Sequence, residues 1–154
     1  MTLEEEFAQA VAAHLDGLAA KVDAALAHVA RGLPDDTRYL MVEYDSPSFA
    51  TGFAVFTFPV LGGGTAGPVR RLLDDGSVVV PPSVYDASRF EEIEPWDTAS
   101  DLLERWLVVR WAALPPPRPE AFVAHHDSFM KTNLADGSRV TADALASLHR
   151  DPHG

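Results

Sequence analysis

The chain has 154 residues, of which 47% are hydrophobic and 23% are charged, a composition typical of one folded domain and not of a disordered chain. Its formal net charge of -11 would repel nucleic-acid phosphates, so we do not expect direct nucleic-acid binding. The lack of cysteine excludes disulfides and thiolate metal sites, and no apolar run is long enough to span a membrane. We expect a cytoplasmic protein with a single domain over residues 1–150 and a flexible tail over 151–154.

A long amphipathic helix is predicted for Thr2–Arg31. Thr2 and Glu5 form a capping box at its start, and Gly32 with Pro34 marks its end. Apolar residues recur every three or four positions, so one face should pack on a broad surface, most simply a sheet. These residues are Leu3, Phe7, Val11, Leu15, Leu18, Val22, Leu26 and Val29. His14 lies on the same face, and we expect it to be a packed side chain with no chemical role.

Two antiparallel hairpins are predicted next. Alternating apolar residues over Arg38–Tyr44 and again over Phe49–Val60 indicate two strands joined by a turn at residues 45–48. Val69–Leu73 and Ser77–Val80 indicate a second pair, joined by an Asp-Asp-Gly turn. Residues Ser83–Glu94 show no clear period, so we interpret them as an ordered loop or a short helix.

A glycine run between the hairpins matches a nucleotide-binding motif in sequence but lacks the structural context that the motif requires. Gly62–Gly67 satisfies G-x-G-x-x-G and follows a predicted strand. The motif binds pyrophosphate only where a helix begins inside the glycine run, but Pro68 and a short strand follow here. We therefore predict a hairpin loop and no nucleotide site.

The central helix is predicted for Trp96–Leu114, a stretch that contains all three tryptophans. Asp97 or Thr98 can cap its start, and Pro115 ends it. Its apolar residues form a face that is much wider than a single narrow stripe, so most of the helix surface should be buried.

Charged residues on this helix carry two further predictions. Arg110 has only apolar neighbours three and four positions away. We expect a structural role, in which its guanidinium extends toward the helix end, stacks on an indole or pairs with a buried acid, with binding of a substrate anion as the alternative. Asp101 and Arg105 are predicted to form an exposed i,i+4 ion pair.

Two strands and a helix complete the pattern. The strands are predicted at Ala121–His126 and Phe129–Leu134, and the helix at Thr141–His149. The predicted fold class is therefore α+β, with an antiparallel sheet of about five strands, a long N-terminal helix, a central tryptophan-rich helix and a short C-terminal helix.

The tetrapeptide His125-His126-Asp127-Ser128 has the most reactive composition in the chain. On a continuous strand, His125 and Asp127 would face one side and His126 the other, so at most two of them could act together. A zinc site needs three or four ligands. We therefore predict no catalytic residue, no metal and no cofactor, while a hydrolase or metal-dependent enzyme that uses these residues stays open as an alternative.

An acidic and aromatic segment is the best candidate for a binding surface. Carboxylates attract a basic partner, and aromatic rings supply contact area at an interface. In the alternative interpretation, the aromatic residues Tyr85, Phe90 and Trp96 anchor a loop in the core and the acids are only solvated. The predicted partner-binding residues are Tyr85, Asp86, Glu91, Glu92, Glu94, Trp96 and Asp97.

The small size, the acidity, the tryptophan helix and the strand that ends in His125-His126-Asp127 resemble the immunity proteins of polymorphic toxin systems. That resemblance implies a protein that is not an enzyme and that neutralises a basic toxin by covering it. The order of helices and strands is also similar to the type III secretion chaperone-like fold, which implies a dimeric chaperone instead. A homodimer is left open, and no membrane partner is expected.

Overall fold

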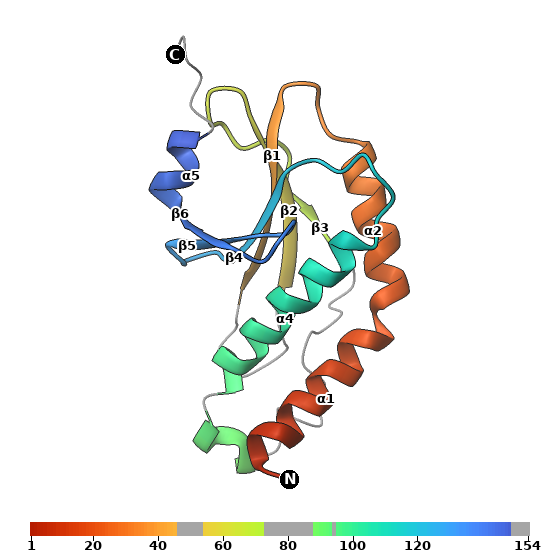
Figure 1. Cartoon of the computed structure of the whole chain (residues 1–154), viewed down its shortest axis with the longest axis vertical. Helices are drawn as coiled ribbons and strands as arrows, with labels where there is room; N and C mark the ends of the chain where they lie inside the picture. The colour runs from red at the N-terminus through yellow and green to blue at the C-terminus, as the bar shows by residue number, and fades with distance from the viewer. Residues whose placement is uncertain (46–53, 73–87, 94, 149–154) are drawn as a thin grey trace.

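A six-stranded sheet forms the centre of the molecule (Figure 1). The structure is a computed structural model that describes residues 1–45, 54–72, 88–93 and 95–148. For residues 88, 89, 91, 95 and 96 it describes the backbone only. The elements in chain order are α1 (Leu3–Gly17), α2 (Ala19–Arg31), β1 (Thr37–Asp45), β2 (Ala54–Leu61), β3 (Arg70–Arg71), the 3-10 helix η1 (Ser88–Ile93), α4 (Pro95–Ala112), β4 (Ala121–His125), β5 (Met130–Asn133), β6 (Arg139–Thr141) and α5 (Ala142–Leu148). Among the described helices, none combines the length and the hydropathy that crossing a bilayer requires.

The α+β class is confirmed, and the sheet is mixed. The strand order is β3-β2-β1-β4-β5-β6, in which β1 and β4 run parallel and every other neighbouring pair is antiparallel. α4 precedes β4 in the chain, and a helical connection of this kind allows β4 to enter the sheet beside β1 in the same direction. The sixth strand, β6, was not predicted because its three residues contain a single apolar side chain, Val140.

The predicted N-terminal helix is two helices. Thr2 caps α1 as predicted, accepting a bond from the Glu5 N–H at 3.1 Å. The helix ends at Gly17, a residue with low helix propensity, and α2 starts after Leu18. Because the apolar spacing continues through the break, periodicity alone could not reveal it. Both helices pack on α4, and their buried side chains also belong to one core cluster with Leu40 and Val42 of the sheet, as the sequence suggested.

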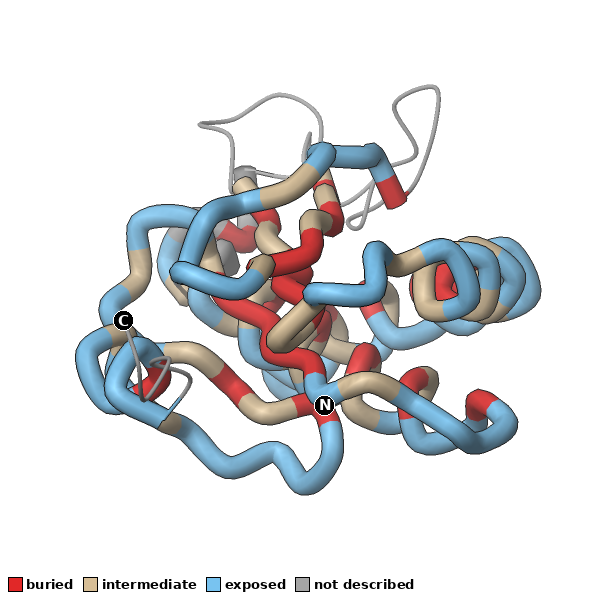
Figure 2. The backbone as a smooth tube through the Cα atoms, turned by 90° about the horizontal axis from the view of Figure 1, so that it is seen from above, coloured by how far each residue is buried: buried red, intermediate tan, exposed pale blue. Residues whose placement is uncertain are grey.

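Apolar side chains cover both faces of the sheet. Leu40, Val42 and Tyr44 of β1 point to the face under α1, α2 and α4, where the main core lies. Met41 points to the opposite face, where a smaller core forms with Leu145 of α5. Figure 2 shows the buried residues concentrated in the central strands and on the inner sides of the helices.

Several sequence predictions match the described strands and loops. β1 and β2 form the predicted antiparallel hairpin. The glycine run lies in the loop between β2 and β3, where Gly63 and Gly64 have φ angles of +86° and +81°, and no helix opens within the run. The predicted strand Ser77–Val80 and the tail over 151–154 lie outside the described residues.

The central helix is observed as α4, but it begins at Pro95, so the prediction that Asp97 or Thr98 caps its start is wrong. One stripe of α4 is buried and the other described positions are partly or fully exposed, so the prediction that most of its surface is buried is also wrong. Leu103, Leu107 and Trp111 are each at most 2% exposed.

Arg110 lies beside Asp23 of α2, with Nη1 and Oδ2 3.5 Å apart. Of the structural roles that the sequence left open for Arg110, the structure shows pairing with an acid, although Asp23 is 37% exposed and not buried, and the pair joins α4 to α2.

Replacing Leu107 with Ala should lower the free energy of unfolding by about 2–5 kcal/mol, because the change leaves a cavity in the main core. Val109 lies on the same helix and is 57% exposed, so Val109→Ala should cost under about 0.5 kcal/mol. Urea unfolding followed by circular dichroism measures both values. Equal losses in the two variants would show that α4 is not buried on the Leu107 side.

Candidate functional site

The structure places only part of the predicted binding segment. Tyr85, Asp86 and Glu94 lie outside the described residues, and for Glu91 and Trp96 only the backbone is described, in η1 and at the start of α4 respectively. The two remaining residues, Glu92 and Asp97, are both exposed. The carboxylates that can be assessed are therefore on the surface.

Phe90 fixes the position of this segment against the N-terminal helix. Its side chain is buried, and its ring centroid lies 5.6 Å from that of Phe7 in α1. For Phe90, the interpretation as a core anchor is therefore the one observed. The contact also places η1 beside the start of α1. The sequence did not predict this proximity, because the two segments are far apart in the chain.

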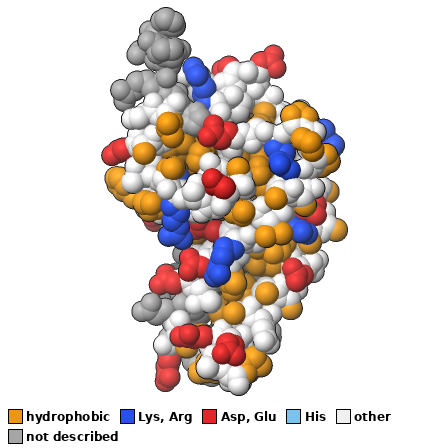
Figure 3. All heavy atoms as spheres, viewed as in Figure 1, with side chains coloured by type: hydrophobic (Ala, Val, Ile, Leu, Met, Phe, Trp, Pro, Cys, Tyr) orange, Lys and Arg blue, Asp and Glu red, His pale blue; other side chains and the backbone are white. Residues whose placement is uncertain are grey.

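Both η1 and the start of α1, which lie beside each other, carry exposed carboxylates. Glu4 and Glu5 of the first turn of α1 are exposed, like Glu92 and Asp97. We call these four residues the acidic end. Figure 3 shows carboxylates over the whole visible face, and the lower part of this face has carboxylates but no visible Lys or Arg. The acidic surface therefore draws on α1 as well as on the segment that the sequence singled out.

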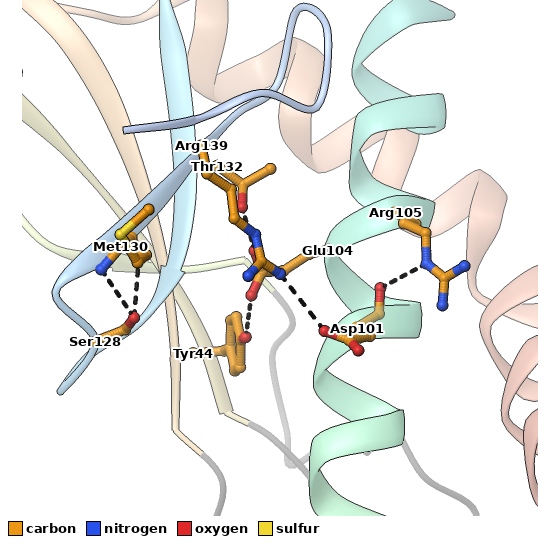
Figure 4. A network of polar contacts seen from close by, with 8 residues as sticks. All are labelled: Tyr44, Asp101, Glu104, Arg105, Ser128, Met130, Thr132 and Arg139. Atoms are coloured by element: carbon orange, nitrogen blue, oxygen red, sulfur yellow. Dashed lines mark hydrogen bonds and ion pairs between the residues drawn. The ribbon is translucent and has the colours of Figure 1, made fainter. Parts of the chain in front are cut away.

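A second polar region is a cleft of about 550 Å³ between α4 and the strands β5 and β6. Glu104 is its central group. Tyr44 donates a hydrogen bond to Oε2 of Glu104, and Thr132 donates to Oε1 at 2.6 Å (Figure 4). Burial, and next the bond to Glu104, raise the pKa of Tyr44 far above its ordinary value.

Charged side chains at the mouth of this cleft also pair across it. Nη2 of Arg139 in β6 lies 3.6 Å from Oδ1 of Asp101, and Nε of Arg105 donates to the Asp101 carbonyl at 3.4 Å. The predicted Asp101–Arg105 side-chain pair is therefore wrong, because the Asp101 carboxylate turns toward a strand that the sequence did not predict. These contacts tie α4 to β5 and β6, so we assign the cleft a structural role.

The histidine cluster differs most from its prediction. β4 ends at His125 and the chain turns over His126 and Asp127, so strand alternation does not apply to them. One ligand atom from each of the three residues lies within 4.8 Å of the other two. The prediction that at most two of them could act together is therefore wrong.

The Tyr44 phenol should make stability fall at high pH. Its pKa is raised in the folded state, so above pH of about 10 the unfolded chain loses a proton that the folded chain keeps, and the free energy of unfolding decreases as pH rises. Tyr44→Phe should flatten this decrease between pH 9 and about 11.

Thr132→Val is the matched control, because it removes the second bond to Glu104 without removing a titrating group. It should lower stability at pH 7 and keep the wild-type pH dependence, as measured by urea unfolding. An unchanged slope in Tyr44→Phe would contradict the assignment.

Comparisons with protein-family models, with curated proteins and with solved structures found no match for this chain.

Proposed function

We propose that this chain acts in the cytoplasm by binding another protein, and that the partner is a basic toxin domain that it neutralises. The observation that supports the proposal is the acidic end, which consists of the exposed residues Glu4 and Glu5 at the start of α1 and the exposed residues Glu92 in η1 and Asp97 in α4. Complementary charge steers two proteins together and fixes their orientation. The net charge of -11 adds to the same attraction.

In this proposal the partner contact combines the acidic end with the aromatic residues Tyr85 and Trp96 of the same segment. Glu92 and Asp97 flank the start of α4, where the backbone of Trp96 lies. The buried contact between Phe7 and Phe90 fixes η1 against α1 before the partner binds, which lowers the conformational entropy lost on binding. In this mode the chain inhibits by covering the toxin and transforms no substrate.

Charge reversal tests the proposal in cells. A bacterial strain that expresses the polypeptide encoded beside this chain's gene should stop growing, and co-expression of the wild-type chain should restore growth. The double variant Glu92→Lys/Asp97→Lys should fail to restore it, because it places two cations against a basic partner. Plating efficiency measures the protection.

The control variant is Asp35→Lys/Asp143→Lys, which changes the net charge equally at two exposed residues outside the acidic end. It should protect as well as wild type. The proposal is wrong if the neighbouring polypeptide is harmless, or if Glu92→Lys/Asp97→Lys, shown to be folded by circular dichroism, protects fully.

A further inference from the structure

The parallel strands β1 and β4 place two potential metal-binding segments next to each other at their C-terminal ends. Tyr44 of β1 is in register with His125 of β4, and the His126 N–H donates to the Tyr44 carbonyl at 3.0 Å. The next residues, Asp45 and His126, therefore lie side by side where both strands end. The carboxyl ends of parallel strands are a common position for ligand sites.

Asp45 orients the imidazole of His126. Nδ1 of His126 is in close contact with the buried Oδ1 of Asp45, and Nε2 faces Oδ1 of Asp127 at 3.1 Å on the other side of the ring. In the neutral tautomer with its proton on Nδ1, Nε2 is an acceptor, as is the Asp127 oxygen. Two acceptors at this distance repel each other unless a proton or a metal cation lies between them.

His125 directs a third lone pair toward the same turn. Its Nδ1 accepts the Asp127 N–H at 3.1 Å, and its ring centroid lies 4.9 Å from that of His126. All three ligand atoms lie within 4.8 Å of one another. Bonds of about 2.0–2.2 Å to a tetrahedral zinc ion would need only a small closure of this turn, with the metal replacing the backbone bond at Nδ1.

We infer that His125, His126 and Asp127 bind a divalent transition-metal ion of the zinc class. Two imidazoles and one carboxylate suit zinc, cobalt or nickel, whereas magnesium and calcium prefer oxygen ligands alone. Asp45 is a positioning residue, because a carboxylate that accepts from the distal nitrogen of a metal-bound histidine fixes its orientation and tautomer. This inference replaces the sequence-based expectation that no metal is bound.

The surroundings of the site leave room for a further ligand on the metal. The side chains of His126 and Asp127 are 49% and 77% exposed, so solvent can reach the ion. A pocket of about 240 Å³ adjoins His126 and Asp45, with Phe56 and Phe58 among its lining residues. Three protein ligands with an open fourth position are typical of exchangeable or catalytic zinc sites and not of closed structural ones. The site shares no residue with the acidic end, so the two proposals can fail separately.

Calorimetric titration with zinc chloride tests the inference on the full, tag-free chain after treatment with a chelator. Wild type should bind one ion per chain with a Kd in the micromolar range or tighter. His126→Gln and Asp127→Asn should each weaken binding at least tenfold, and Asp45→Asn should weaken it by about 10–100-fold as a positioning residue. His28→Gln removes an exposed histidine of α2 and should leave the Kd unchanged.

Cobalt substitution gives a readout of geometry. Visible absorption bands of a tetrahedral cobalt(II) ion should appear with wild type and His28→Gln and be lost with His126→Gln. Circular dichroism confirms that each variant is folded. The inference is overturned if wild type binds no zinc, or if folded His126→Gln binds it as tightly.

Discussion

The burial of α4 between the sheet and the two N-terminal helices is the constraint on which the rest of the structure depends. Leu103, Leu107 and Trp111 are almost inaccessible to solvent. Glu104, on the same helix, accepts bonds from Tyr44 and Thr132 of two strands. A carboxylate with both oxygens bonded at the edge of an apolar core fixes the rotation of the helix as well as its position.

The positions of the acidic end and of the proposed metal site both depend on α4, the first on where the helix begins and the second on where the chain enters the sheet after it. At its start, η1 is pinned to α1 by Phe7 and Phe90, which assembles the acidic end from distant segments. Beyond its end, the chain enters β4 parallel to β1 and brings His126 beside Asp45. A helical crossover therefore sets the geometry of the proposed metal site, while the packing of α1 sets that of the proposed partner surface.

Sequence pattern predicted what depends on local periodicity and could not predict what depends on long-range pairing. The cap at Thr2 and the β1–β2 hairpin followed from local spacing, whereas the partner of Arg110, Asp23, lies 87 residues away in the sequence and was not predicted. The pairing of Asp101 with Arg139 depends on a strand too short to show alternation. The histidine cluster was misjudged because its strand ends one residue earlier than expected, and a turn breaks the alternation on which that prediction rested.

The central claim is that the acidic end meets a basic protein, and hydrogen exchange followed by mass spectrometry tests it most directly. The chain should be compared alone and in complex with the neighbouring-gene polypeptide. The account predicts slowed exchange in the first turn of α1, in η1 and at the start of α4, with the edge strands β5 and β6 unchanged. Slowed exchange over β5 and β6, with these three segments unchanged, would contradict it.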